Sequence, residues 1–313
     1  MTKDLFKILN GGMNSTLLID SNNLTSVVFG SEIYYIQAEG PFQSVTVSNE
    51  YYSNLTTSHL TKIYDSSQMT IQNIQMTQIS NPNLDTYESY FDDIYSIFSL
   101  NSSDSLTLSN LTITDSSLSY ASLFTLYEIS QSSITTLSIS NLSMSYKDLI
   151  IAERCENMTI SSSSLTSISM TSSYYRPLTF LNLLNIDTML DSSLSLTLNS
   201  VEYSSNSIYL LDLPKTVPNT FSMSIFNLTA SSNSITSDGT ISIAPTNTGR
   251  ISMDIQNSTI SSNSYTVNST SFLYIAPKTG RFSITIEYTK FQTNTGTMIY
   301  MEAGNNQISH SFL

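Results

Sequence analysis

A short pattern of alternating apolar residues, closed by a polar pair, recurs along this chain. Clear copies are "LTLSNLTI" from Leu106, "MSIFNLTA" from Met223 and "MDIQNSTI" from Met253. From Val45 onward, the starts of successive copies are separated by 24, 37, 31, 21, 38, 27, 30 and 31 residues. Self-similarity at a pitch of about thirty residues is typical of solenoids, in which each repeat buries its apolar side against its neighbours.

The alternation predicts β-strands, because neighbouring side chains of a strand point to opposite faces. Its parity changes at the polar pair: Leu106 and Leu108 precede the pair, whereas Leu111 and Ile113 follow it. The apolar side chains stay inside only if the backbone turns a corner there. Asn suits such a corner because it tolerates the left-handed backbone conformation. We therefore expect one column of corner residues at Asn49, Asn73, Asn110, Asn141, Asn227 and Asn257.

A second polar column and a third strand follow in each later repeat. "SSNS" occurs at 204–207, 231–234 and 261–264, and "QTNT" at 292–295. Short strands such as "ISIAP" (241–245) come next. Three strands per repeat, separated by polar corners, describe one coil of a parallel β-helix. The second column of expected corner residues is Asn206, Asn233, Asn263 and Asn294.

We predict an all-β fold, a right-handed parallel β-helix with about nine or ten three-strand coils of roughly 30 residues. It would form a single solenoid over residues 1–313, with a less regular first part (1–43) and insertions at 84–104 and 172–192. A β-sandwich also has many short strands, but it does not repeat a polar corner at a fixed pitch. We expect the chain to be a segment of a longer protein or a repeating subunit.

These coils resemble the right-handed parallel β-helix of the pectin-lyase-like superfamily, in which Asn ladders line a corner. The segment "FQTNTGTMIY" (291–300) is also similar to the Phe-x-x-Asn repeats of polymorphic outer-membrane proteins and related surface β-helices. The similarity to the surface repeats implies a surface protein. The resemblance to the pectin-lyase-like superfamily implies an enzyme instead, because enzymes of this fold are mostly polysaccharide lyases and hydrolases.

Charge and composition exclude several classes of protein. The net charge is -13, and only 11 residues are Lys or Arg, too few and too scattered to bind nucleic acid. No apolar run is long enough for a transmembrane helix, and the start lacks the apolar core of a signal peptide. The single cysteine, Cys155, is expected to be a small buried residue.

Candidate catalytic residues are few. Asp92 and Asp93 form the one tight acidic pair, and we interpret it as a solvated loop, with a catalytic or calcium site as the alternative. Arg250 and Arg281 share the Thr-Gly-Arg position of successive coils and should lie one above the other. Such a basic column is more often a solvated face than an anion site. No phosphate loop, Cys/His cluster or Ser-His-Asp arrangement is discernible, and we expect no cofactor and no metal.

Sites for N-linked glycans are frequent, but a chain so rich in Asn, Ser and Thr contains many by chance. A corner Asn that faces outward can carry a glycan, whereas one that faces inward forms a buried ladder. The Asn-x-Ser/Thr matches are Asn14, Asn23, Asn54, Asn101, Asn110, Asn141, Asn157, Asn227, Asn257 and Asn268.

Two functions fit these observations. We expect a non-enzymatic structural or adhesive protein of the extracellular space or cell surface, which carries glycans and assembles end to end with itself. The alternative is a diverged polysaccharide-active enzyme that uses Asp92 or Asp93. Carbohydrate is a further expected partner, because outward tyrosines can stack on sugars. The tyrosines considered for this role are Tyr51, Tyr52, Tyr174 and Tyr175.

Overall fold

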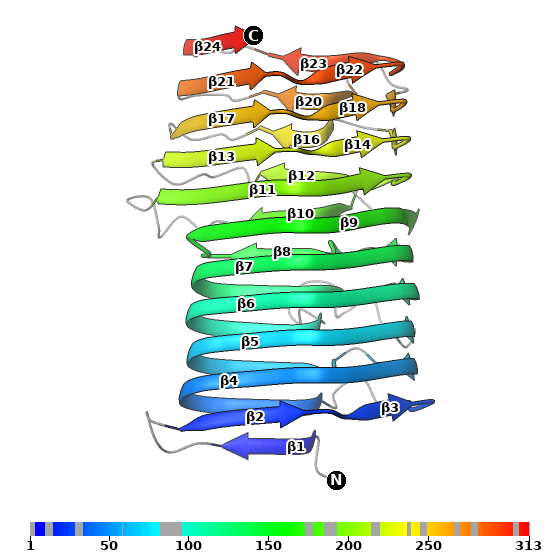
Figure 1. Cartoon of the computed structure of the whole chain (residues 1–313), viewed down its shortest axis with the longest axis vertical. Coiled ribbons are helices and arrows are strands. Elements are labelled where there is room, and N and C mark those ends of the chain that lie inside the picture. Colours follow the sequence, from blue (N-terminus) through cyan, green and yellow to red (C-terminus); the bar gives the residue numbers. More distant parts are fainter. Residues whose placement is uncertain are drawn as a thin grey trace.

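The chain folds into a β-solenoid whose strands stack as successive turns along one axis (Figure 1). The structure is a computed structural model. It describes residues 4–9, 15–28, 34–57, 59–81, 96–172, 178–184, 193–213, 220–236, 239–244, 249–265, 270–276, 281–302 and 307–312.

Every strand pairing among these residues is parallel, and no helix occurs in them. The described structure confirms the predicted all-β solenoid, while the right-handed sense and the number of coils stay predictions. Four long strands bend through most of a turn: β4 (Tyr34–Thr56), β5 (Thr61–Ser80), β6 (Ser96–Leu118) and β7 (Ser122–Ser145). Two more bend through part of a turn, β9 (Asn157–Ser172) and β11 (Ser193–Ser204).

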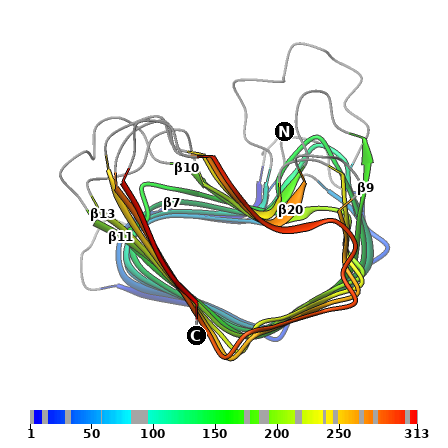
Figure 2. The same ribbon diagram turned by 90° about the horizontal axis from the view of Figure 1, so that it is seen from above.

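The remaining strands are shorter and lie in register with parts of the long ones. We distinguish three faces of the solenoid, which a turn visits in the order third, first, second (Figures 1 and 2). The first face contains β2 (Thr16–Asp20), β13 (Thr220–Phe226), β17 (Arg250–Gln256), β21 (Arg281–Glu287) and β24 (Gln307–Phe312). The second contains β3 (Asn23–Thr25), β14 (Thr229–Ser231), β18 (Thr259–Ser261) and β22 (Lys290–Gln292). The third contains β1 (Asp4–Leu9), β8 (Ile150–Glu153), β10 (Thr179–Leu184), β12 (Tyr209–Leu213), β16 (Gly239–Ile243), β20 (Ser271–Ile275) and β23 (Thr297–Met301). A small pair, β15 (Ser234–Ile235) with β19 (Ser264–Tyr265), follows the second face.

Part of the two expected insertions belongs to the solenoid. The segment 84–104 was expected to leave the coils, but β6 begins at Ser96 and pairs with β5. Likewise β10 lies within 172–192 and pairs with β8 and β12. Both strands are too apolar to lie outside the core, since Phe98 and Phe180 are each 1% exposed.

Residues with positive φ mark the corners, and the strand register aligns them into columns. The first corner separates the first and second faces, and the second corner ends the second face. The first-corner column is Ser21, Asn49, Asn73, Asn110, Thr136, Ser162, Ser200, Asn227, Asn257 and Tyr288. The second-corner column is Ser26, Asn54, Gln78, Asp115, Asn141, Ser167, Ser205, Ser232, Ser262 and Thr293.

One expected corner residue lies in a different column from the others. Asn141 does turn a corner, with a φ of 53°, but its register partner is Asp115 of the second corner. The two corners have the same local pattern, because each follows a strand segment with alternating apolar residues. The sequence pattern therefore placed "LSISN" (137–141) on the first face, whereas the structure places it on the second.

Asn206, Asn233, Asn263 and Asn294 form an internal ladder. Each follows a second-corner residue, so the left-handed position belongs to the preceding Ser or Thr and not to the Asn. The first three are 1% exposed. The Asn263 Oδ1 accepts the backbone N–H of Asn233 at 3.0 Å and its Nδ2 at 2.8 Å, and the Asn263 Nδ2 lies 3.0 Å from the Ala230 carbonyl. The ladder thus gives hydrogen-bond partners to buried polar groups, which would destabilise the fold if they were buried without partners.

Like residues stack through the interior from turn to turn. One inward column is apolar over its whole described length, and burying each such side chain stabilises by roughly 1.5–3 kcal/mol. Its members are Val47, Ile71, Leu108, Ile134, Ile160, Leu198, Ile225, Ile255 and Ile286.

The ladder predicts a large difference between two asparagines of one turn. Asn263→Ala leaves buried groups of Asn233 and Ala230 without partners, and each costs about 1–3 kcal/mol, so we expect a loss of about 3 kcal/mol. Asn257→Ala, at the exposed first corner, should cost about 1 kcal/mol, the penalty for a left-handed Ala. Urea unfolding followed by circular dichroism measures both, and equal losses would contradict the buried ladder.

Candidate functional site

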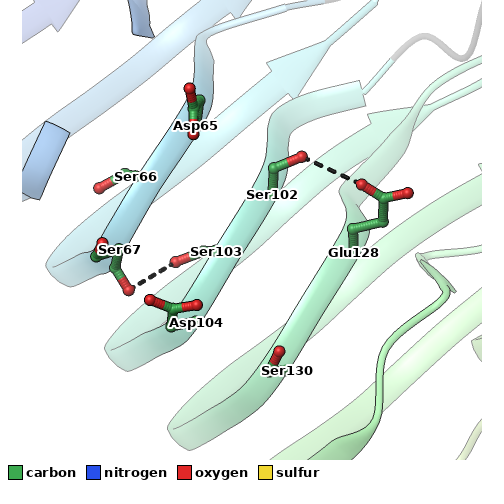
Figure 3. Close-up of a pocket in the computed structure, with 8 residues that line it drawn as sticks. All are labelled: Asp65, Ser66, Ser67, Ser102, Ser103, Asp104, Glu128 and Ser130. Atoms are coloured by element: carbon green, nitrogen blue, oxygen red, sulfur yellow. Dashed lines mark hydrogen bonds between the residues drawn. The ribbon is translucent and has the colours of Figure 1, made fainter. Parts of the chain in front are cut away.

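The candidate site is a polar hollow at the third corner, between the third and first faces (Figure 3). Asp65, Ser102 and Glu128 each have a positive φ and occupy equivalent positions of β5, β6 and β7. The hollow has a volume of about 280 Å³ and is open to solvent. It is lined by Asp65, Ser66, Ser67, Ser102, Ser103, Asp104, Glu128 and Ser130.

Hydrogen bonds to the backbone hold the inner serines of the hollow. The Ser103 hydroxyl lies 2.9 Å from the Ser105 carbonyl and 3.2 Å from the Ser67 carbonyl, and Ser66 donates to the Gln68 carbonyl at 2.8 Å. At the rim, Ser102 donates to a Glu128 oxygen at 3.4 Å (Figure 3). The carboxylates of Asp65 and Asp104 are exposed, so they remain able to accept hydrogen bonds from a ligand.

Arg154 continues the corner column beyond Glu128. Its Nη1 lies 2.6 Å from Glu128 Oε1 and 2.8 Å from the Tyr127 hydroxyl, and its guanidinium carbon is 5.4 Å from the centre of the Tyr127 ring. The hydrogen bond that Arg154 donates to Glu128 raises the pKa of Arg154, so the guanidinium stays charged. One carboxylate of the hollow is therefore neutralised by its neighbour.

The hollow presents carboxylate and hydroxyl oxygens in a row that follows the strand spacing. Such groups can bind a hydroxylated or amine-bearing ligand by hydrogen bonds. In the part of the chain that the structure describes, no three His, Cys, Asp or Glu side chains are grouped as metal ligands. Sequence reasoning missed this corner, because its left-handed positions carry Asp, Ser, Glu and Arg and share no residue type.

The residues considered for catalysis do not join this hollow. Asp92 and Asp93 lie outside the described residues. Arg250 and Arg281 are register partners on the first face, both exposed, as the repeat predicted. Also away from the hollow, the histidine His59 is 6% exposed on the third face, where its Nδ1 lies 3.2 Å from the Ser96 carbonyl.

The structure divides the sequon asparagines by exposure. Five lie at left-handed corner positions with exposed side chains, and Asn23 is exposed at the start of β3. Asn101 and Asn157 are half-buried, and Asn14 and Asn268 fall outside the described residues. The five corner sequons are Asn54, Asn110, Asn141, Asn227 and Asn257.

The outward first-corner asparagines form a second, external ladder. Asn110 Nδ2 donates to Asn73 Oδ1 at 2.8 Å, and Asn73 Nδ2 donates to Asn49 Oδ1 at 2.9 Å. Asn49 Nδ2 donates in turn to Asp20 at 2.7 Å. Hydrogen bonds from Ser48 and Asn49 lower the pKa of Asp20. A glycan on Asn110 would extend from the end of this ladder.

The tyrosines considered for sugar stacking do not form a common platform. Tyr51 is half-buried and Tyr52 is fully buried, so the expectation that Tyr52 faces outward was wrong. Tyr52 lies one residue further along the strand and therefore points into the core. Tyr174 and Tyr175 lie outside the described residues.

Glu50 is an acid inside the solenoid. It follows the first corner, is 1% exposed, and accepts hydrogen bonds from Asn22 at 2.7 Å and from the Tyr52 hydroxyl at 3.3 Å. Burial raises the pKa of Glu50 despite the opposing hydrogen bond from Asn22, and the charge of Asp20 raises it further. The same position carries Ile74 and Leu111 in the next turns.

The raised pKa of Glu50 predicts that the free energy of unfolding decreases as pH rises. Between the ordinary value of 4.5 and the raised pKa, the folded protein keeps a proton that the unfolded chain releases. The free energy of unfolding should therefore decrease through this window and level off above it. Glu50→Gln should remove this decrease and be the more stable protein at neutral pH. Urea unfolding between pH 4 and 8 measures the effect, and identical pH profiles for both proteins would contradict it.

The burial of Cys155 predicts that its thiol reacts slowly in the folded protein. Its Sγ is 3.9 Å from the Leu126 carbonyl, the residue is 8% exposed, and burial raises the pKa of the thiol to about 12. With an unfolded pKa near 8.5, the thiolate fraction at pH 8 should be roughly 1,000-fold lower in the folded protein. Reaction with an aromatic disulfide reagent should be slowed accordingly and should become stoichiometric in urea. Rapid reaction of the native thiol would show that this part of the core is open.

Comparison with protein-family models, with curated proteins and with solved structures finds no match to this chain. Among the described residues, no helix has the length and apolar character needed to cross a membrane.

Proposed function

We propose that this chain is a structural or adhesive glycoprotein of the cell surface or extracellular space, and that it works as a β-solenoid rod without a cofactor. The observation that carries this proposal is the placement of the sequons. Asn110, Asn227 and Asn257 line the exposed first corner, and Asn54 and Asn141 line the exposed second corner. Glycans at these positions would project from two edges of the rod without disturbing its core.

Within a corner sequon, both recognition residues face outward. The corner Asn is followed by one inward residue and then by an outward Thr or Ser, as in Asn227, Leu228 and Thr229, of which only Leu228 is buried. The inward Asn233 and Asn263 of the internal ladder belong to no sequon. The chain thus keeps its buried and its sequon-bearing asparagines in separate columns.

End-to-end assembly is the second part of the proposal. Inward apolar side chains of the first and last described turns, such as Leu17, Ile19, Phe291 and Met298, are only partly buried, unlike those of the middle turns. A further coil from a second copy would cover them and add strand hydrogen bonds. Such contacts would extend the rod into a filament or surface array.

A polysaccharide lyase or hydrolase, related to the pectin-lyase-like superfamily, is the second candidate. The observation that favours it is the third-corner hollow, which Asp65, Asp104 and Glu128 line and where Glu128 pairs with the cation Arg154. An assay for new reducing ends on acidic and neutral polysaccharides tests it. Loss of activity on Asp104→Asn, with unchanged folding, would establish this candidate over the first.

Secretion from a eukaryotic host tests the proposed glycoprotein directly. Glycopeptide mapping should find glycans at the five corner sequons and none at the inward Asn206, Asn233, Asn263 or Asn294. Asn→Gln substitution of one corner sequon should remove one glycan mass and lower the unfolding free energy by about 1 kcal/mol, because Gln then occupies the left-handed position. A secreted, folded protein without glycans would contradict the proposal.

A further inference from the structure

The outward side of the first face is uncharged over seven successive turns. On β4, β5, β6, β7, β9, β11 and β13, three neighbouring outward columns contain only Ser, Thr, Asn and Gln, apart from Phe226. We call this surface the neutral face. Its columns are Ser44, Gln68, Ser105, Gln131, Asn157, Ser195 and Ser222; Thr46, Thr70, Thr107, Ser133, Thr159, Thr197 and Ser224; and Ser48, Gln72, Ser109, Thr135, Ser161, Asn199 and Phe226.

The absence of charge is local to this face. In the same turns, charged residues gather on the third face and at the third corner, among them Lys62, Asp65, Asp104, Glu128 and Arg154. In the next turns the same columns carry acids: Asp254 follows Ser224, and Glu287 follows Gln256. A chain with a net charge of -13 repels a second copy over most of its surface. That repulsion is weakest where the neutral faces of two copies meet.

The neutral face is also periodic, which makes it complementary to itself. Parallel pairing sets neighbouring rows about 4.8 Å apart, so two copies have the same repeat along their whole length. Small side chains such as Ser133 and Ser161 let two sheets approach to about 10 Å. Uncharged Ser, Thr, Asn and Gln side chains then interdigitate in a dry interface, as in the paired sheets of steric zippers.

The area reaches that of a small specific interface. Seven rows at about 4.8 Å, and three outward columns that span five residues at about 3.3 Å, give a surface of roughly 34 by 17 Å. Two copies would together bury about 1,100 Å², above the roughly 1,000 Å² expected of a specific protein–protein interface. Phe226, half-buried at one edge, adds an aromatic side chain to the contact.

We propose that two copies of this chain pack side by side through their neutral faces, related by a two-fold axis. The contact is lateral, so it does not depend on the end-to-end assembly proposed above, and together the two contacts would form a sheet-like array. A flat polysaccharide surface is the less favoured occupant, because sugars are bound largely through aromatic side chains and this face has only Phe226.

Introducing positive charge at the centre of the face tests the proposal. Analytical ultracentrifugation of the full chain at 0.15 M salt should show a dimer with a Kd of about 1 µM or tighter. Ser133→Lys with Thr159→Lys places like charges on both partners, so the Kd should rise at least tenfold. The matched control is Ser138→Lys with Ser164→Lys, on the same two strands but on the second face, where the dimer should persist. Circular dichroism confirms that each variant is folded.

A cross-link tests the geometry independently. Ser133 lies in the central column of the middle row, so it is near the two-fold axis whether the rods run parallel or antiparallel. Ser133→Cys should join two copies through a short bis-maleimide, and Ser138→Cys should not. A monomeric wild type, equal dissociation of both Lys variants, or binding only to neutral polysaccharide such as cellulose would overturn the proposal. End-to-end filaments that survive Ser133→Lys with Thr159→Lys would leave the rod function standing while confirming that the lateral contact is separate.

Discussion

Hydrogen bonding between successive turns is the constraint on which the rest of this structure depends. Parallel pairing fixes the rise per turn at about 4.8 Å and places each residue above its register partner. An apolar residue is therefore stabilised only if the same position is apolar in the neighbouring turns, as in the column that runs through Ile134 and Ile160. The same stacking aligns corner residues, external asparagines and uncharged side chains into long columns. Surface properties of this protein are thus properties of columns and not of single residues.

Corners in the left-handed conformation let each turn change direction without a loss of pairing. At the first corner an Asn such as Asn257 faces solvent, whereas at the second corner of the later turns a Ser or Thr takes the left-handed position and the next Asn points inward. One residue of difference decides between an external position, such as Asn257, and an internal ladder, such as Asn263. The chemical outcome differs completely, because only the external residue is able to carry a glycan.

Much of the fold was predictable from the sequence, since the repeat, the strands and most corner positions follow from parity and pitch. The register was harder. Asn141 was placed in the wrong column because both corners follow an alternating segment, and only pairing with Asp115 distinguishes them. The third-corner hollow was not predictable, because its column of Asp65, Ser102 and Glu128 shares geometry without sharing residue type. The neutral face likewise appears only when the register brings together residues from distant turns. The buried Glu50 has no sequence signal, as its neighbours in the column are apolar.

The central claim is that the register of the turns separates an inward polar ladder from outward, sequon-bearing corners on a self-associating rod. Cryo-electron microscopy of the secreted protein, at a resolution that shows side chains, tests it most directly. The account predicts turns about 4.8 Å apart, Asn233 and Asn263 inside, glycan density at Asn227 and Asn257, and rods in contact through the uncharged face of β4 to β13. A map in which Asn263 faces solvent, or in which Asn227 and Asn257 are buried, would contradict it.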